Sequence, residues 1–509
     1  MSAKFSSSAT WNPRSFLNLR TTVGGDYTNI EDDGANSTGT VLPPGGSTVD
    51  QASTRTGGMT WPVATKTLGF FAQEQFGLRD RMFITVAARS DQNSAFGTKF
   101  QRVVYPKASL SWLISDESFF PKPSFLNSFR LRTAYGASGV QPGRTDGLIT
   151  FTAGNQNLPN RANGSTSGVD TPALAANQAG NADLRPEKSY EYEGGFESQI
   201  LSNRVRIDYT AYLKRTNDAL IRVDVAPSSG ASELNPLRNI GSTENTGHEL
   251  SVNAQLFNRR ALSWDVTLTG SHESNKVLDL GIDPVTGESR ILGAGGATQQ
   301  RVGYPVNSRW GRGFKYADSN GDGILQPSEV VVDSAFSYLG YAFPRDIFSV
   351  QNSIGLFNGR VRLSGLFDYK GGWTLQDGGN NFQCGTGPFA CREVQDPTAP
   401  LAWQARNVAK IYGTAYGQTT VKTSVGYLEN GQFWKFREFS ATYMIPVSAL
   451  RYVRAAGGSS FVFAMRNLHT WTSYTGIDPE EFDGPGDTQS NFQSAPPARY
   501  MTFRLNLKY

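Results

Sequence analysis

The chain has no long apolar segment, and it is poor in cysteine, histidine and charge. No run approaches the roughly 20 apolar residues that a membrane-spanning helix needs, so the sequence excludes a helical membrane protein. Two cysteines and three histidines in 509 residues leave too few ligands to favour a zinc centre. The net charge of +4 is small for this length, so the composition indicates no nucleic-acid partner.

Glycine and aromatic residues are abundant instead. Charged residues make up 18% of the chain, against about 25% in an average protein. Glycine occurs 54 times, and aromatic residues reach 12%. This balance indicates many turns and strands and few helices. Low mean hydropathy is compatible with a transmembrane barrel, because only alternate side chains of each strand face lipid.

Apolar and polar side chains alternate along many segments, which places successive side chains on opposite faces of a strand. Val205, Ile207 and Tyr209 fall on one face of such a run. Arg206 and Asp208 fall on the other. The runs are about 9–15 residues long, which suits a tilted membrane strand of about 9–11 residues better than a sandwich strand of about 5–6. We predict roughly 16 strands of this kind, centred near residues 6, 20, 70, 86, 107, 132, 194, 210, 250, 268, 303, 351, 366, 437, 462 and 503.

Short polar turns alternate with long connections. Short turns are expected at residues 12–14, 202–204, 258–260 and 358–360, and long ones near 30–60, 140–186, 276–297, 311–345 and 374–428. Outer-membrane barrels are built in this way, with the short turns on the periplasmic side. We therefore predict an all-β, antiparallel transmembrane β-barrel with long extracellular loops. Two alternatives stay open: the turns mark ordinary β-hairpins, or the chain is a secreted array of β-sandwiches.

Five segments carry recognisable motifs in a fixed order, at residues 105–117, 181–189, 245–250, 367–372 and 466–480. Two of them read N-A-D-L-R-P-E-K-S at Asn181–Ser189 and W-T-S-Y-T-G-I-D-P-E at Trp471–Glu480. Together these motifs resemble the SusC/RagA family of TonB-linked outer-membrane receptors. The resemblance covers about residues 65–509, nearly the whole chain.

The resemblance implies a TonB-dependent transporter in the outer membrane of a Gram-negative-type bacterium. Such a protein contacts membrane lipid, imports large nutrients such as oligosaccharides or peptides, and is not an enzyme. The TonB complex would supply energy through an N-terminal plug, and a SusD-like surface lipoprotein would cover the long loops. The alternative is a passive outer-membrane barrel or adhesin without active transport.

Neither a plug domain nor a signal peptide is visible in this sequence. The N-terminal residues Met1–Ser6 have no apolar segment after a basic start. Plugged transporters have about 22 strands, so about six would lie upstream of Met1. We therefore expect residues 1–509 to be the C-terminal barrel portion of a longer protein, ending in a strand that runs to Tyr509.

Residues 318–329 fit the spacing of a calcium-binding EF-hand loop. Oxygen ligands would come from Asp318, Asn320, Asp322 and Glu329, and from the backbone carbonyl of Ile324. No helical sequence flanks this loop, unlike the loop of a true EF-hand. The sequence predicts a Ca²⁺ site here, and the alternative is an Asp/Asn/Gly turn without metal.

The two cysteines, Cys384 and Cys391, lie in the long connection 374–428. In an exported protein such a pair favours a disulfide over a metal site. The same connection carries aromatic residues that suit contact with sugar rings. We take Trp373, Phe382, Phe389 and Trp403 as candidate ligand contacts, the alternative being that they pack against one another.

The sequence contains no grouping of nucleophile, base and acid that indicates catalysis. Its glycine-rich runs lack the lysine and hydroxyl residue of a phosphate-binding loop. The adjacent acids Glu480 and Glu481 are predicted to lie on a solvated extracellular loop. No catalytic residue and no organic cofactor is therefore predicted.

Overall fold

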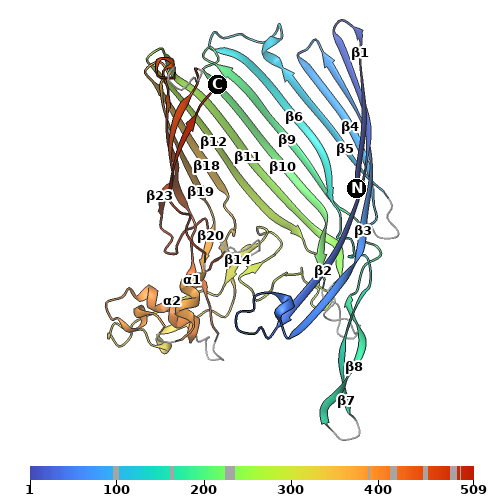
Figure 1. The fold of residues 1–509 in the computed structure, drawn as a ribbon, viewed down its shortest axis with the longest axis vertical. Coiled ribbons are helices and arrows are strands. Elements are labelled where there is room, and N and C mark those ends of the chain that lie inside the picture. The colour runs from blue at the N-terminus through green and yellow to red at the C-terminus, as the bar shows by residue number, and fades with distance from the viewer. Residues whose placement is uncertain are drawn as a thin grey trace. The chain divides into compact units, whose positions relative to one another are not determined.

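The computed structural model describes residues 1–95, 102–160, 165–223, 236–387, 390–412, 421–450, 457–481, 490–492 and 494–508. Fifteen of its strands form one hydrogen-bonded sheet in which sheet order follows chain order (Figure 1). They are β1 (Ser2–Arg14), β2 (Leu17–Thr40), β3 (Thr54–Leu78), β4 (Met82–Asn93), β5 (Val103–Leu113), β6 (Leu126–Val140), β9 (Glu187–Ile200), β10 (Val205–Arg222), β11 (Leu237–Arg259), β12 (Leu262–Asp279), β18 (Asp346–Leu356), β19 (Val361–Gly371), β22 (Phe433–Met444), β23 (Ser460–Thr472) and β25 (Tyr500–Asn506). The predicted all-β antiparallel barrel architecture is confirmed as a partial barrel, since in this order β1 and β25 are the two edge strands.

Fifteen of the predicted strands correspond to these elements, and the one predicted near residue 303 is wrong. That segment holds only the short β13 (Thr298–Gln299), followed by irregular chain. Gly303 and Asn307 adopt left-handed φ angles of +85° and +54°. Left-handed residues interrupt regular strand pairing, and Pro305 between them has no backbone N–H to donate to a ladder.

The alternation of short and long connections is present as predicted, with altered bounds. Short turns such as residues 201–204 and 357–360 alternate along the chain with long connections such as 280–345 and 372–432. The predicted loops 276–297 and 311–345 are two parts of one connection. Much of the predicted loop 30–60 is instead a hairpin, because backbone pairing between β2 and β3 continues to Thr40 and Thr54.

The chain divides into two compact units, and each is described by itself. Unit 1 comprises Met1–Trp112, Thr133–Tyr192 and Lys214–Ser242, and unit 2 comprises Leu113–Arg132, Glu193–Leu213 and Thr243–Tyr509. Unit 1 adds a two-stranded hairpin, β7 (Thr150–Asn160) and β8 (Ser165–Gln178), within one long connection. Its 3-10 helix η1 (Val49–Gln51) lies between β2 and β3.

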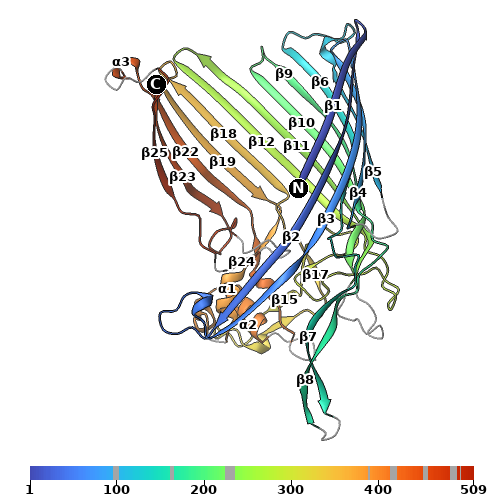
Figure 2. The ribbon, with the colours of Figure 1, turned by 45° about the vertical axis from the view of Figure 1, so that its right-hand side comes forward.

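The long connections of unit 2 fold into small elements of their own. One three-stranded sheet joins β13, β14 (Ser308–Gly311) and β17 (Ser337–Gly340). A second joins β20 (Thr374–Asp377), β21 (Leu428–Asn430) and β24 (Ser490–Asn491). In addition, β15 (Phe314–Tyr316) pairs with β16 (Val330–Val332). The helices are α1 (Gly378–Gly385), α2 (Leu401–Ile411), α3 (Val447–Leu450), η2 (Ile114–Asp116), η4 (Pro327–Glu329), η5 (Arg392–Gln395) and η6 (Val425–Tyr427). Figure 2 shows α1, α2 and β15 gathered at one end of the strands of unit 2. Among the described residues, no helix has the length and apolar character to cross a membrane.

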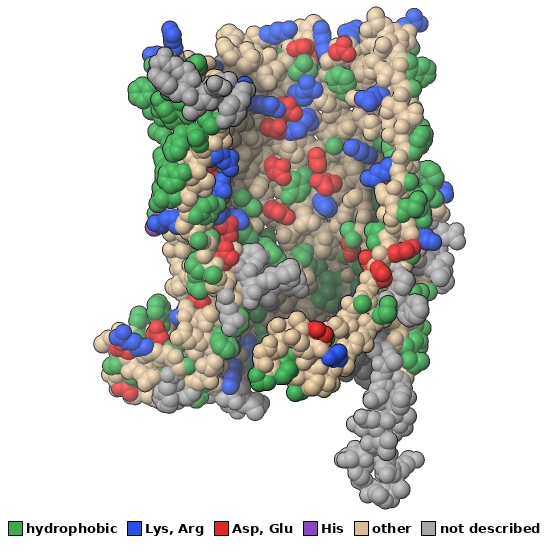
Figure 3. Space-filling view, in the orientation of Figure 1, with side chains coloured by type: hydrophobic (Ala, Val, Ile, Leu, Met, Phe, Trp, Pro, Cys, Tyr) green, Lys and Arg blue, Asp and Glu red, His purple; other side chains and the backbone are tan. Residues whose placement is uncertain are grey.

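The two faces of the unit 2 strands differ as the alternation predicts. On β19 and β22 the rings of Phe367 and Phe436 stack 4.3 Å apart. The neighbouring residues Asp368 and Arg437 form an ion pair at 2.6 Å. Figure 3 shows acidic and basic side chains spread over the strand face that this view presents, with hydrophobic side chains along the flanks. This separation suits a wall with lipid on one side and a polar lumen on the other.

Candidate functional site

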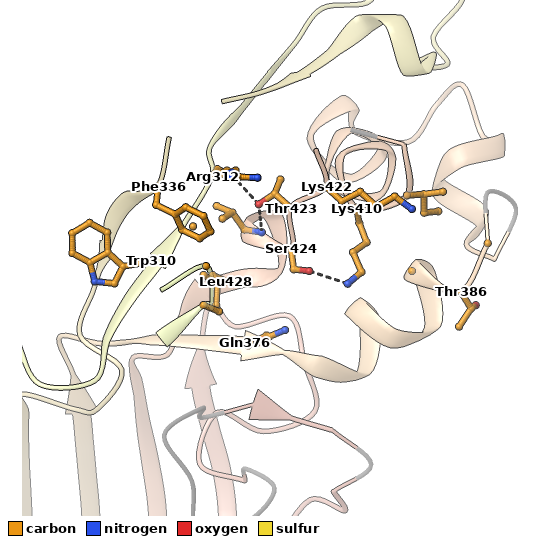
Figure 4. A pocket seen from close by; sticks show the side chains of 17 residues that line it. Trp310, Arg312, Phe336, Gln376, Thr386, Lys410, Lys422, Thr423, Ser424 and Leu428 are labelled. Atoms are coloured by element: carbon orange, nitrogen blue, oxygen red, sulfur yellow. Dashed lines mark hydrogen bonds between the residues drawn. The ribbon is translucent and has the colours of Figure 1, made fainter. Parts of the chain in front are cut away.

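A pocket of about 650 Å³ lies between the connections 280–345 and 372–432 of unit 2. This volume falls within the range of about 300–1,000 Å³ that is typical of small-molecule sites. Trp310 and Phe336 lie on one side of it, and Lys410, Lys422 and Thr386 on the other (Figure 4). We call this cavity the basic pocket.

The small sheet β13–β14–β17 supports the aromatic side of the basic pocket. Trp310 is 4% exposed, and its indole N–H donates to Ser308 Oγ at 2.8 Å. The guanidinium of Arg301 lies 3.9 Å from the centre of its ring, and this cation–π contact helps to fix the indole. The neighbouring Arg309 is fully buried, and this burial lowers the pKa of its guanidinium to about 10. The contacts with Ser308 and Arg301 therefore hold the indole of Trp310 in place.

A side-chain hydrogen bond joins the two connections at the pocket: Thr423 Oγ1 donates to the backbone carbonyl of Arg312 at 2.8 Å (Figure 4). Within the second connection, Lys410 Nζ donates to Ser424 Oγ at 3.0 Å. Close approach at this point requires a glycine, because a Cβ on Gly311 would overlap the side chain of Val425. The pocket is thus built by two segments about 100 residues apart in sequence.

Positive charge dominates the lining of the pocket. Arg312, Lys410 and Lys422 line it, and none of its described lining residues carries a carboxylate. Arg312 packs its guanidinium against the ring of Phe336, 4.9 Å from the ring centre. Lys410 comes from the last turn of α2, where a cation is also favoured by the helix dipole.

Cys384 and Cys391 form a disulfide in the structure, with their Cα atoms 5.0 Å apart. This separation lies in the usual range for a disulfide. Both cysteines are buried against Tyr427, whose pKa is raised by burial to about 12. Residues 385–387, inside the disulfide loop, form part of the pocket rim. Glu393 lies near the two sulfurs, but cysteines bonded to each other offer no thiolate to a metal.

Of the four aromatic residues predicted to contact ligand, the three that the structure describes do not line the basic pocket. Trp373 is 4% exposed and packs with Phe433 in a small core, so its ring does not face a ligand. Phe382 on α1 and Trp403 on α2 are 58% and 40% exposed, which leaves contact with a partner or ligand open to them. Phe389 lies outside the described residues.

The predicted calcium loop lies between β15 and β16, so strands flank it, as its sequence indicates. Both carboxylate oxygens of Asp318 accept backbone N–H groups, from Gly321 and Gly323. Glu329 closes the loop by accepting from the backbone of Ser319 at 2.7 Å. Among the described residues, the acids of this loop do not converge as a set of three carboxylates within 4.8 Å. The residues suit a cation in type and spacing. In this structure, however, the carboxylates of Asp318 and Glu329 accept hydrogen bonds from backbone N–H groups.

A fully buried glutamine fixes this loop to α2. Gln404 accepts from the backbone N–H of Leu325 at 2.9 Å and donates to the carbonyl of Gly323 at 2.8 Å. Leu325 and Val330 pack with Val408 of α2 in a small apolar core. These contacts attach the loop to the helix that carries Lys410.

A buried ion cluster joins the chain after β23 to β19 and β22. Its members are Asp368, Lys370, Lys435, Arg437, Asp478 and Glu480, which we call the Lys435 cluster. Lys435 Nζ lies 2.7 Å from Asp478, and the two side chains are 5% and 8% exposed.

Glu480 accepts hydrogen bonds from three cationic side chains of this cluster. Burial opposes its ionisation, but these hydrogen bonds outweigh burial and hold the pKa of Glu480 well below its usual range. The prediction that Glu480 lies on a solvated loop is therefore wrong. The motif that contains it folds back against basic residues of the strands.

The sequence does not single out the residues that form the basic pocket. Trp310, Arg312 and Phe336 are ordinary members of a long connection, and Lys410 and Lys422 follow about 100 residues later. Their proximity depends on how two loops pack. The one available signal was an excess of basic over acidic residues near 406–422.

Comparison with known proteins agrees with the observed fold. A family model described as TonB dependent receptor-like, beta-barrel, matches residues 2–356. A TonB-dependent receptor of Formosa agariphila is 27% identical over 86% of this chain and 46% of its own length. The TonB-dependent receptor SusC of Bacteroides thetaiotaomicron is 24% identical over 52% of this chain and 28% of its own length.

Solved structures show the same architecture. The RagAB peptide transporter superposes with a TM-score of 0.76 at 20% identity, covering 99% of this chain and 55% of that one. The open state of the RagAB peptide importer gives a TM-score of 0.78. The chain spans about half the length of the Formosa agariphila relatives that it matches.

The resemblance to SusC/RagA proteins predicted from the motifs is confirmed. Proteins of this type lie in the outer membrane, as the strand pattern predicted. The family model covers more than half of the chain, and its range runs from β1 to the end of β18 in the observed sheet. The chain belongs to the TonB dependent receptor-like β-barrel family.

Proposed function

We propose that the chain forms the barrel wall and the extracellular loops of an importer for large nutrients, oligosaccharides or peptides. A SusD-like surface lipoprotein covers the long loops in this proposal, and the TonB complex supplies energy through an N-terminal plug. The relationship to SusC and the fold shared with the RagAB peptide transporter support it. The proposal assigns the chain no catalytic step.

The ordered long connections of unit 2 are the main structural support for this proposal. The long connections of unit 2 contain their own cores, a disulfide and a pocket of about 650 Å³. A passive pore needs no such ordered loops, whereas a receptor needs a preformed surface to recognise its ligand. An adhesin would also use ordered loops, so energy dependence separates the two functions.

The test uses the complete gene in its own host. Cells with and without the gene are given fluorescein-labelled maltoheptaose and a fluorescein-labelled tryptic digest of casein, and periplasmic fluorescence is measured. We expect the deletion to abolish uptake of one probe, and loss of TonB to do the same in cells that retain the gene. Uptake that persists without TonB would identify a passive barrel. Surface binding with no gene-dependent uptake of either probe would identify an adhesin.

We further propose that Ca²⁺ binds the loop 318–329 and draws the oxygens of Asp318, Asp322 and Glu329 together. The spacing of the donors supports this, and a bound ion would replace part of their bonding to backbone N–H groups. Calorimetric titration of calcium into the full-length protein tests it. We expect heat of binding from the wild type and from Asp283→Asn, which changes a partly exposed acid of the same connection. Equal heats from wild type and Asp318→Ala would refute the calcium site.

A further inference from the structure

We infer that the basic pocket binds a carboxylate or sulfate group carried by the imported oligomer, which makes the proposed importer selective for acidic ligands. This inference rests on the proposed function and narrows its substrate class. It is based on three observations: the charge of the pocket lining, the hydrogen bonds and ion pairs that engage the neighbouring acids, and the contacts that restrict the pocket walls.

The charge of the lining is unbalanced. Arg312, Lys410 and Lys422 line one cavity whose volume corresponds to a sphere about 11 Å across. Separations of this size are close to the Debye length of about 10 Å at 0.1 M salt, so each cation is exposed to the field of the others. An anion in the cavity would relieve this repulsion.

The carboxylate of Asp333 lies against Gly313, next to Arg312 in sequence, but Asp333 is not on the lining. Two other acids of the same connections, Glu429 and Asp377, are engaged elsewhere. Glu429 accepts hydrogen bonds from Thr475 and pairs with Arg406. Asp377 accepts from the backbone and the side chain of Asn380. Within the described part of the chain, no ion pair is recorded for the three lining cations. Residues 413–420, which precede Lys422, contain no acidic residue in the sequence.

The lining also offers the neutral donors that an oxyanion needs beside its counter-charges. Ser424 Oγ lies next to Lys410 Nζ, and the side chains of Gln376 and Thr386 are on the lining. Arg312 can present two parallel N–H groups, a geometry that matches carboxylate and sulfate oxygens. Trp310 and Phe336 supply an apolar wall against which the body of a ligand can lie.

The pocket is preformed. The hydrogen bond between the two connections, the contacts of Trp310 with Ser308 and Arg301, and the disulfide at the rim all restrict its walls. Gly385 leaves room for the stem of Lys410, since an added Cβ would lie 3.0 Å from Lys410 Cε. A preformed site loses little conformational entropy when it binds, so even one small acidic group can anchor there.

The experiment compares acidic and neutral ligands of equal size on purified full-length protein, by calorimetry. Trigalacturonate is compared with galactotriose, and the peptide Glu-Gly-Glu with Gln-Gly-Gln, so that a sugar acid and a peptide acid are distinguished. We expect one acidic probe to bind at least about tenfold more tightly than its neutral partner, and its affinity to fall as salt rises.

Variants then test whether the basic pocket causes the preference for the acidic probe. The double variant Lys410→Gln/Lys422→Gln keeps most of each side chain and is expected to lose the preference, about tenfold in affinity. Lys315→Gln, an exposed cation of the same loops outside the pocket, is the matched control and should keep it. Heat-modifiable migration on gels verifies that each variant is folded.

Two outcomes overturn the inference: equal affinity for both acidic probes and their neutral partners, or a preference that survives in the double variant. Neither outcome affects the proposed import, which is judged by gene-dependent uptake in cells. Conversely, tight binding of an acidic probe without any gene-dependent uptake would support the pocket and contradict import.

Discussion

The Lys435 cluster and the basic pocket each contain three cationic side chains, and they differ in what faces those cations. In the Lys435 cluster, Lys370, Lys435 and Arg437 meet three carboxylates and are largely buried. In the basic pocket, the lining cations meet no carboxylate and enclose an open volume. Cations that are paired within the chain hold two segments together, whereas cations left unbalanced around a cavity are available to a ligand.

Breaking the paired cluster should give the largest effect. Lys435→Met leaves Asp478 buried without its closest cation, which typically costs about 3–5 kcal/mol. We expect residues 473–481 to detach from the strands and become sensitive to protease, and the unfolding temperature to fall. Arg466→Met, which removes an exposed pair with Glu438, should change either measurement little. A protease pattern identical to wild type in Lys435→Met would show that the cluster does not hold this segment.

Acid should weaken the same cluster through Glu480. Because its folded pKa lies below the ordinary value of 4.5, the stability that Glu480 contributes is fully present above pH 4.5. It is lost as pH falls from 4.5 toward the folded pKa. Hydrogen exchange of residues 473–481 should therefore stay slow from pH 7 to near pH 4.5 and accelerate, after correction for intrinsic rates, in stronger acid. In Glu480→Gln this pH dependence should be absent, and finding it unchanged would assign it to another group.

Adding a carboxylate to the basic pocket should make it resemble the Lys435 cluster. Thr386→Asp places an acid at the rim, on the side of the pocket that carries Lys410 and Lys422. We expect the affinity for the preferred acidic probe to fall about tenfold, with a smaller change for its neutral partner. The isosteric control Thr386→Val removes the hydroxyl without adding charge. An acidic probe that binds Thr386→Asp and Thr386→Val equally well would argue against a charge-selective pocket.

Opening the disulfide should produce the smallest change. The paired substitution of serine for Cys384 and Cys391 frees a rim of a few residues, and closing so short a loop contributes about 2–3 kcal/mol at most. We expect a severalfold loss of affinity for the acidic probe and no change in heat-modifiable migration, since the barrel strands lie elsewhere. Calorimetry and gel mobility measure the two. A barrel that unfolds more readily would contradict this separation.

The barrel wall could be predicted from the sequence because its pattern is local. Alternation along runs such as Val205–Tyr209 depends only on which face each side chain occupies, so fifteen strands were located correctly. The segment near Gly303 misled the prediction because alternation says nothing about φ, and a left-handed glycine with a nearby proline disfavours regular strand pairing.

The loop sites could not be predicted in the same way. Lys410 meets Trp310 across a cavity only after two connections have packed, and no sequence period encodes that packing. Glu480 was assigned to solvent because adjacent acids usually lie there; its partners Lys435 and Arg437 precede it by about 40 residues. The disulfide between the two cysteines could be predicted, because few alternatives exist for two cysteines in an exported chain.

The short turn between β18 and β19 has a practical consequence for topology mapping. Phe357, Asn358 and Gly359 adopt consecutive left-handed conformations there, and the turn has no long loop of its own. In an outer-membrane barrel such turns face the periplasm and the long connections face the medium. A single cysteine at Asn358 should therefore resist a membrane-impermeant maleimide on intact cells, and one at the exposed Trp403 should react. Those two positions would act as fixed reference marks for the orientation of the barrel in a living cell.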